Sequence, residues 1–240
     1  MFRHKGKTRT LKHNLRIASL LSFVAGIVNT TGFLAIQRLT TNVTGHFAYL
    51  IEEVFKFEFW KGFIFFLYIF FFFLGSFVSN LFIELISKNS NKLSYTVPIF
   101  IESAILFLTA IFGQFLILES PNSFAFILLF AMGLQNSLVT SISNSKVRTT
   151  HLTGLFTDLG IELSQLFFYT QEDQQLKLYS SIKLRLTIIN FFFLGGIIGA
   201  ILYSQINLYT LIFAGLILIC AGVYDSIKLK WILLKRKRMR

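Results

Sequence analysis

The sequence predicts an all-α, polytopic helical membrane protein with six spanning helices, two short re-entrant or interfacial helices and an inverted 3+3 repeat. Three observations lead to this fold class. Hydrophobic residues make up 54% of the 240 residues and charged residues only 14%, whereas soluble domains carry roughly a quarter charged residues. Six segments are apolar over about the 20 residues that a spanning helix needs. Several motifs recur, in the same order, in the second half of the chain.

The elements follow the chain as apolar stretches separated by polar loops. The predicted spans are 17–36, 62–86, 97–118, 124–142, 186–203 and 208–224, the last of which is short. Two further helical segments, 44–57 and 153–169, carry acidic side chains and are too short and polar to be routine spans. We therefore expect a first membrane repeat at 17–118 and a second at 119–224, between basic cytoplasmic tails at 1–16 and 225–240.

Three pairs of motifs indicate an internal duplication. At offsets of 107, 109 and 120 residues, the pairs are Gly26-x-x-Asn29 with Gly133-x-x-Asn136, Thr44-Gly45 with Thr153-Gly154, and Phe-Phe-Phe-Leu-Gly at 71–75 and 191–195. The last pair opens two small-xxx-small patterns, Gly75/Ser79 and Gly195/Gly199, which allow helices to approach closely. We expect these patterns to pack one repeat on the other, with a homodimer face as an alternative.

Loop charge decides between six and eight spans. With six spans, seven loop cations lie in the cytoplasm and three outside; with eight, the two sides carry five each. The positive-inside rule therefore favours six. Three spans per repeat is an odd number, so the second repeat enters the membrane from the opposite face. The cytoplasmic cations are Lys88, Lys92, Lys146, Arg148, Lys177, Lys183 and Arg185, and the outer ones are Arg38, Lys56 and Lys61.

The net charge of +12 comes from the two tails. Residues 1–16 hold six Lys/Arg and residues 226–240 hold seven, without any acid, while the stretch between them has ten basic and eleven acidic residues. Tails of this kind flanking spans favour anionic lipid headgroups of the bilayer as partners, and not nucleic acid. Signatures of metal sites, phosphate loops and nucleophile elbows are missing, so we expect no metal, no cofactor and no enzyme activity.

The repeated Thr-Gly pairs are the first candidate site. Thr44 and Thr153 are suited to cap the two short helices, and Gly45 and Gly154 allow sharp turns or close backbone approach. If both helices start near the membrane midplane, their positive ends converge there and favour an anion or a hydrogen-bond acceptor. In the alternative, the pairs simply start two amphipathic helices at the surface.

Polar side chains inside or beside the spans complete the candidate substrate-binding site. Asn29 and Asn136 occupy matching places in the first and fourth spans, where a buried amide needs a partner. The neighbouring Gln135 favours a polar cavity at this place, and a hydrogen bond joining the repeats is the alternative.

Asp158, Glu162 and Gln165 share one helix face. This face either has a functional role at membrane depth or is exposed to water at the membrane interface. His46 and His151 either bind substrate, sense pH or hydrogen-bond the loop backbone locally, and the neighbouring Thr150 is predicted to belong to the substrate site. Glu84 and Glu102 stand close enough to span ends to reach headgroups.

At these residues the sequence resembles the YoaK-like family of uncharacterised bacterial inner-membrane proteins, a domain of unknown function. The resemblance covers roughly residues 20–205 and implies a multi-pass protein of the bacterial inner (plasma) membrane. Six or eight spans both put the two termini on one side, and the basic tails predict that this side is the cytoplasm. It rests on Gly26-Ile27-Val28-Asn29 with Gly32-Phe33-Leu34, on Asn42-Val43-Thr44-Gly45, on Gly133-Leu134-Gln135-Asn136, and above all on Arg148-Thr149-Thr150-His151-Leu152-Thr153-Gly154 followed by Thr157-Asp158-Leu159-Gly160.

The chain departs from the family pattern at three places. The family usually has an acidic residue where Asn29 stands, an asparagine where His46 stands, and an asparagine near Leu155. The missing carboxylate at Asn29 weakens an ion-coupled mechanism centred there, and His46 offers a titratable group nearby.

Inverted repeats with interrupted helices are a recurring design of transporters and channels. We therefore predict a transporter or channel for an unidentified small solute bound at the repeat interface. The alternatives are a non-transporting scaffold or regulator acting through its tails and, third, an intramembrane enzyme.

Overall fold

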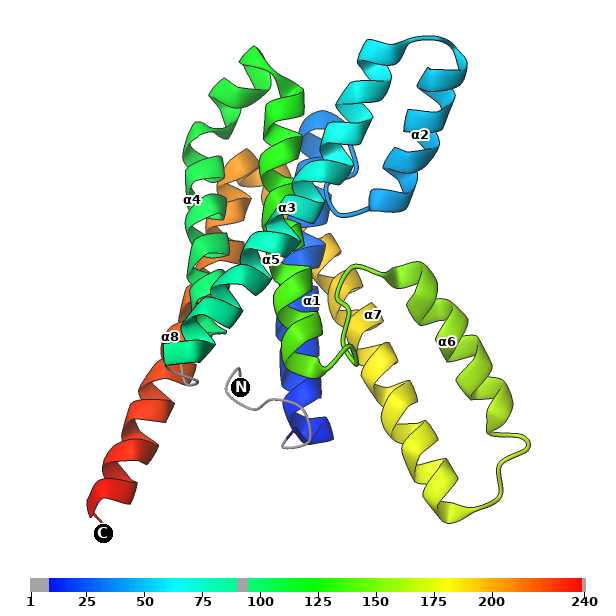
Figure 1. Ribbon diagram of the computed structural model, residues 1–240, viewed down its shortest axis with the longest axis vertical. Coiled ribbons are helices and arrows are strands. Elements are labelled where there is room, and N and C mark those ends of the chain that lie inside the picture. Colours follow the sequence, from blue (N-terminus) through cyan, green and yellow to red (C-terminus); the bar gives the residue numbers. More distant parts are fainter. Residues whose placement is uncertain (1–8, 90–94, 239–240) are drawn as a thin grey trace.

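In the computed structural model, which describes residues 9–89 and 95–238, the chain is all-α, and no strand occurs among these residues (Figure 1). Every predicted helical segment corresponds to an observed helix, so the all-α class is confirmed. The elements are α1 (Leu11–Ile36), α2 (Val43–Phe55), α3 (Phe59–Asn89), α4 (Thr96–Glu119), α5 (Pro121–Ser143), α6 (Leu152–Gln165), α7 (Glu172–Ile206), the 3-10 helix η2 (Asn207–Tyr209) and α8 (Thr210–Arg238).

Five segments of the described chain are long and apolar enough to cross a membrane, which supports an integral membrane protein. Four of them are α1, α3, α4 and α5. The fifth runs over Glu172–Ile227 and contains both α7 and α8. The chain reverses direction at η2 between these two helices (Figure 1). The two short helices, α2 and α6, are not among the candidate spans.

Three helices extend six or more residues beyond the predicted apolar stretches. α1 begins at Leu11, inside the predicted N-terminal tail, and α8 continues to Arg238 through most of the predicted C-terminal one; residues 1–8 and 239–240 lie outside the described chain. α7 begins at Glu172, well before the predicted start of its span at 186. Its 35 residues correspond to about 52 Å, longer than the ~30 Å hydrocarbon core. Hydropathy locates the lipid-embedded part of such a helix and misses its polar extension.

The two halves pack on each other in a mirrored way. α1 packs on α7 and α5 packs on α3, while α4 packs on α8. Each short helix lies on the long helix that follows it, α2 on α3 and α6 on α7. In Figure 1, α1 and α5 run in opposite directions, as do α3 and α7. The N-termini of α2 and α6 both lie near mid-height on one side of the molecule (Figure 1).

The repeated glycines allow this packing. A Cβ at Gly26 would lie 2.1 Å from the carbonyl oxygen of Phe192, and one at Gly133 would lie 2.1 Å from that of Phe72. On the opposite helices, a Cβ at Gly195 or Gly75 would meet a backbone carbonyl, of Phe23 or Phe130, at a similar distance. Helices at this separation require glycine. The prediction that these motifs pack one repeat on the other is therefore confirmed.

The same contacts correct the alternative of a homodimer through Gly75/Ser79 or Gly195/Gly199. All four residues are buried inside the chain. A Cβ at Gly199 would lie 2.9 Å from the Cα atom of Ile27. Because the small side chains are already used to seat one helix of the chain on another, they are not available to a second copy.

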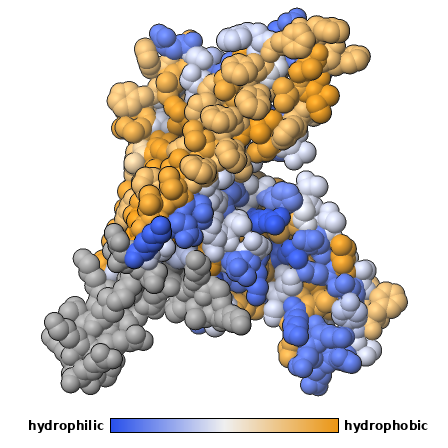
Figure 2. All heavy atoms as spheres, viewed as in Figure 1, coloured by the Kyte–Doolittle hydropathy of each residue, from blue (hydrophilic) through white to orange (hydrophobic). Residues whose placement is uncertain are grey.

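The surface is divided by polarity. Figure 2 shows hydrophobic side chains over the upper part of the molecule, where α2 and α3 lie, and hydrophilic ones over α6 and the start of α7. Many large apolar side chains are exposed on the spans, among them Phe73 and Phe77 on α3 and Phe193 on α7. Exposed apolar surface of this extent is typical of helices that contact lipid.

Candidate functional site

A cavity of about 850 Å³ lies in the second half of the molecule. It is bounded by the start of α1, by the loop 144–151, by α6 and by the first half of α7. Three of the predicted site residues, His151, Gly154 and Asp158, line it. Its other walls come from Arg9, Leu11, Asn14, Ser145, Lys146, Arg148, Leu155, Leu176, Lys177, Ser180, Ser181, Leu184 and Arg185.

The cavity lining is strongly cationic. Five of its residues are Arg or Lys and one, Asp158, is acidic, which gives a formal charge of 5 − 1 = +4. Lys146, Arg148 and Lys177 are exposed and make no ion pair within the described chain. A concave surface of one charge sign raises the local concentration of oppositely charged ligands. The arrangement therefore favours an anion.

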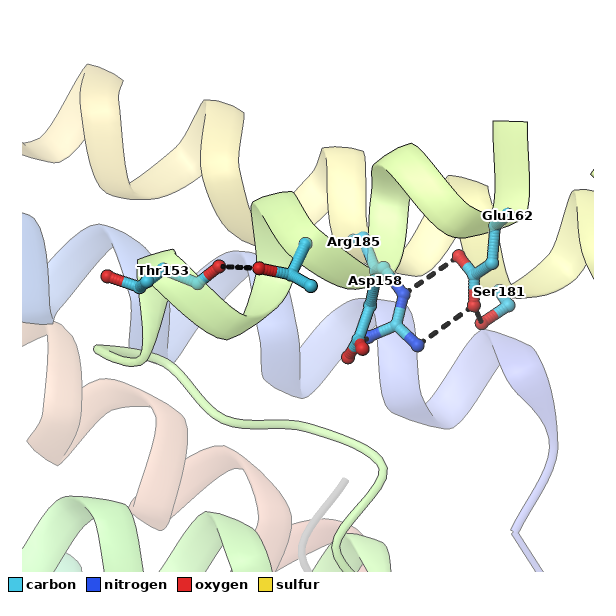
Figure 3. A network of polar contacts seen from close by, with 6 residues as sticks. Thr153, Asp158, Glu162, Ser181 and Arg185 are labelled. Carbon is cyan, nitrogen blue, oxygen red and sulfur yellow. Dashed lines mark hydrogen bonds and ion pairs between the residues drawn. The ribbon is translucent and has the colours of Figure 1, made fainter. Parts of the chain in front are cut away.

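Arg185 joins the two helices that enclose the cavity (Figure 3). Its Nε and Nη2 atoms donate to the two carboxylate oxygens of Glu162, each at 2.8 Å, and its Nη1 lies 2.9 Å from Oδ2 of Asp158. Ser181 also donates to Glu162, at 2.5 Å. The predicted shared face of Asp158 and Glu162 thus holds α6 against α7. Arg185 itself was missed, although an Arg at the edge of a span opposite two acids is a recognisable signal.

The first half of the chain has an aromatic contact where the second has this ion pair. By the offsets of 109 and 120, Tyr49 and Phe65 match Asp158 and Arg185 (49 + 109 = 158; 65 + 120 = 185). Tyr49 and Phe65 stack with ring centroids 5.2 Å apart. At these matched positions the two halves therefore differ in chemistry, with an aromatic contact in the first half and an ion pair in the second.

Asn29 and Asn136 hold loops and do not line the cavity. Thr41 donates to Oδ1 of Asn29 at 2.6 Å, and Thr150 donates to Oδ1 of Asn136 at 3.0 Å. Each bond ties a span to the loop before the short helix of the same half. Both asparagines are thus hydrogen-bonded, as the alternative predicted. Each bond lies within one half of the chain, however, and does not join the two repeats.

Removing the Asn29 carbonyl should loosen the loop that leads into α2. We expect Asn29→Leu and Thr41→Val each to lower the free energy of unfolding by about 1 kcal/mol, the usual contribution of one hydrogen bond. Because the two side chains form one bond, the double variant should cost no more than the larger single effect. Thermal unfolding in detergent measures this, with exposed Thr44→Val as the control. Additive losses would contradict the assignment.

The helix starts differ from the prediction of threonine caps. Asn42 caps α2, with its Oδ1 accepting from the Gly45 amide at 3.0 Å, and His151 occupies the cap position of α6. Thr44 and Thr153 are the second residues of their helices and are exposed. They do not line the cavity, so the two Thr-Gly pairs do not form one site there.

The two histidines have different environments. His46 is buried, with Nε2 2.7 Å from the carbonyl oxygen of Leu39 and its ring 4.6 Å from that of Tyr68, so the local loop contact is confirmed. His151 is exposed at the cavity, and its ring covers Gly154, where a Cβ would lie 2.5 Å from Nδ1. Gly154 therefore makes room for the imidazole at the cavity wall.

Gln135 and Glu102 form a buried pair between α5 and α4. Nε2 of Gln135 donates to Oε1 of Glu102 at 3.0 Å, and Oε1 of Gln135 accepts from Thr149 at 3.3 Å. The Glu102 side chain is completely buried. The prediction that it reaches lipid headgroups is therefore wrong, because the packing of α4 on α5 and α8 turns it inward.

The comparisons with known proteins identify a family without a known activity. The family model described as "Protein of unknown function (DUF1275)" matches residues 17–224. No curated protein and no solved structure matches the chain.

Proposed function

The chain belongs to the DUF1275 family of proteins of unknown function, and from that premise we propose that it is a transporter or channel that moves a small anionic solute across a bacterial inner membrane. The observation that carries the proposal is the cationic cavity between α6 and α7. Its volume of about 850 Å³ falls in the range of sites for small molecules.

The proposed mechanism depends on an inverted repeat of three spans each, with α7 and α8 as the fifth and sixth spans. Its support is the opposite direction of the matched helices (Figure 1) and the mirrored glycine contacts. Transporters with such repeats expose a central site to each side in turn by rocking one repeat against the other. In this proposal the present conformation is one of these two states, and the cavity is the site's opening to one side of the membrane. The short helices α2 and α6 are re-entrant helices.

We place the cavity on the cytoplasmic side, together with both termini. α1 begins and α8 ends at the end of the molecule where the cavity lies (Figure 1). Four of the loop cations, Lys146, Arg148, Lys177 and Arg185, line the cavity, as the positive-inside rule expects of the cytoplasmic side; Lys92 lies outside the described residues. In Cys220→Ser, a membrane-impermeant thiol reagent should label Lys177→Cys only from the cytoplasm and Lys56→Cys only from outside. Labelling of both from one side would contradict this topology.

Neutralising the free cations of the cavity should impair transport. We expect purified protein in proteoliposomes to take up at least one of inorganic phosphate, sulfate or a dicarboxylate. Lys146→Gln with Arg148→Gln should reduce that uptake about tenfold or more, because a hydrogen bond to a charged group contributes about 1.5–3 kcal/mol. Lys183→Gln is the matched control: Lys183 is exposed on α7 but does not line the cavity.

The outcomes separate the proposal from its rivals. Uptake of cations or neutral solutes with no anion uptake would overturn the anionic substrate. Failure of every solute in the panel to exceed empty liposomes would overturn transport and support a scaffold acting through the tails.

A further inference from the structure

Glu102 is a carboxyl group sealed inside the helix bundle. Its side chain is 0% exposed and lies on α4, in a segment apolar enough to span the membrane. Oε1 accepts one hydrogen bond, from Nε2 of Gln135 on α5 at 3.0 Å. Oε2 is buried and has no hydrogen-bond partner among the residues that the structure describes. Half of this carboxyl group is therefore unsatisfied in the present conformation.

The surroundings of Glu102 do not stabilise a negative charge. Within the described chain, Gln135 is the one side chain that hydrogen-bonds the carboxyl group, and no charged group of α4, α5 or α8 faces it. An ionised carboxylate at membrane depth with a single hydrogen bond is costly, by several kcal/mol. A protonated carboxyl group is far less costly, because it leaves only a neutral hydroxyl unpaired. This conformation thus requires the acid to be neutral.

We propose that Glu102 is a proton-binding site that holds a proton in this conformation and releases it to water when the interface of α4 and α5 opens. The step transfers one proton from the carboxyl oxygen to water and leaves a carboxylate. An acid that is neutral in a closed state and ionised in an open one links proton binding to the change of state. The proposal goes beyond solute binding and does not depend on which solute moves.

The partner of Glu102 connects it to the cavity wall. Oε1 of Gln135 accepts a hydrogen bond from Thr149 at 3.3 Å. Thr149 belongs to the loop 144–151, which also carries Lys146 and Arg148 at the cavity. A movement of this loop changes the orientation of the Gln135 amide, and through it the hydrogen bond to Glu102. Movement of the cavity loop and loss of the proton are thereby coupled through the contacts of Thr149 and Gln135.

The interface of α1 and α8, which matches that of α4 and α5 in the duplication, lacks this polar pair. Contacts of Phe100 with Gly222 and of Phe107 with Gly215 mirror each other at an offset of 115 residues. At that offset Ile217 matches Glu102 (102 + 115 = 217), and Val28 matches Gln135 at the offset of 107. Val28 belongs to the buried apolar core, and Ile217 packs against that core. Only one of two equivalent interfaces therefore carries a proton-binding group, as expected of a specific function and not of general packing.

Infrared spectroscopy of the purified protein in lipid nanodiscs tests the proposal. A protonated carboxyl group has its own carbonyl-stretch band, well separated from that of a carboxylate. We expect this band at neutral pH in the wild type, its absence in Glu102→Gln, and its reversible loss as the pH is raised. Glu84→Gln, which changes an exposed acid on α3, should leave the band unchanged.

Two results would overturn the proposal. A missing band at neutral pH would show that Glu102 is ionised, and a band unchanged up to the pH at which the fold is lost would show a fixed structural proton. If Glu102→Gln does not fold, Gln135→Leu still decides the assignment. Removal of the Nε2 donor should shift the Glu102 band to higher frequency, and an unshifted band would belong to another group.

Discussion

Gly133→Ala is expected to be among the most destabilising single substitutions in this protein. The new Cβ would lie 2.1 Å from the carbonyl oxygen of Phe72 and 3.0 Å from the amide nitrogen of Ser76 on α3. Both atoms belong to the backbone of α3, so α3 and α5 must move apart. Overpacking of a well-packed contact costs about 1–3 kcal/mol, and we expect the upper part of that range. Gly26→Ala should cost a similar amount, because its contact with Phe192 on α7 is the mirrored one.

Thermal unfolding in detergent, followed by circular dichroism, measures the effect. Gly160→Ala is the matched control: it makes the same chemical change within a helix, but a Cβ at Gly160 meets nothing within 4 Å. Alanine stabilises a helix interior by about 0.5–1 kcal/mol relative to glycine, so this variant should unfold at the same or a higher temperature. Equal melting temperatures for Gly133→Ala and the wild type would contradict the close approach of α3 and α5.

Arg185→Gln should release α6 from α7. Removal of the guanidinium leaves the Glu162 carboxylate, which is only 13% exposed, with Ser181 as its remaining partner. Breaking a fully buried ion pair costs about 3–5 kcal/mol. Because Arg185 is 21% and Asp158 49% exposed, solvent screening lowers the expected loss to about 2 kcal/mol. Arg185→Lys should recover little of it, since an ammonium group does not reproduce the paired bonds to Glu162.

Hydrogen exchange read by mass spectrometry localises this change. The amides of α6 should exchange faster in Arg185→Gln, while those of α1, which packs on the other end of α7, keep their rates. Lys177→Gln is the control, because Lys177 lines the same cavity but makes no ion pair in the described chain. Unchanged exchange of α6 in Arg185→Gln would show that its apolar contacts alone hold it, namely Leu159 against Leu178 and Ile182.

The helices were predictable because each is encoded locally. A segment in lipid must satisfy its own backbone hydrogen bonds, so an apolar stretch of spanning length predicts a helix directly. The predicted span 97–118, for example, agrees with α4 to within one residue at each end. The polar ends of α7 and α8 were missed because hydropathy does not indicate where a helix ends once it has left the bilayer. The prediction of a threonine cap for α2 was wrong because Asn42, two residues before Thr44, is an equally good cap.

The candidate site was only partly predictable. Three of its residues, His151, Gly154 and Asp158, follow one another in the chain and form a recognisable block. Arg185 and Arg9 complete the cavity from distant parts of the sequence, and their approach depends on the packing of α1 and α6 on α7. The burial of Glu102 likewise depends on the packing of α4 on α5. Contact with Gln135 encloses a carboxyl group that the sequence alone places near the end of a span.

By itself, the sequence determined the membrane class, the helices, the duplicated motifs and the family. These properties depend on composition and on periods of a few residues, which each segment expresses without its neighbours. Only the tertiary structure decided which helices meet. It showed that the glycine of each Phe-Phe-Phe-Leu-Gly motif lets a helix of the opposite half pack closely, and that Asn29 and Asn136 anchor loops. It also showed that the charged cavity is formed by the start of α1 together with α6, α7 and the loop 144–151. Those outcomes depend on contacts between residues far apart in the chain, whose energies no local pattern records.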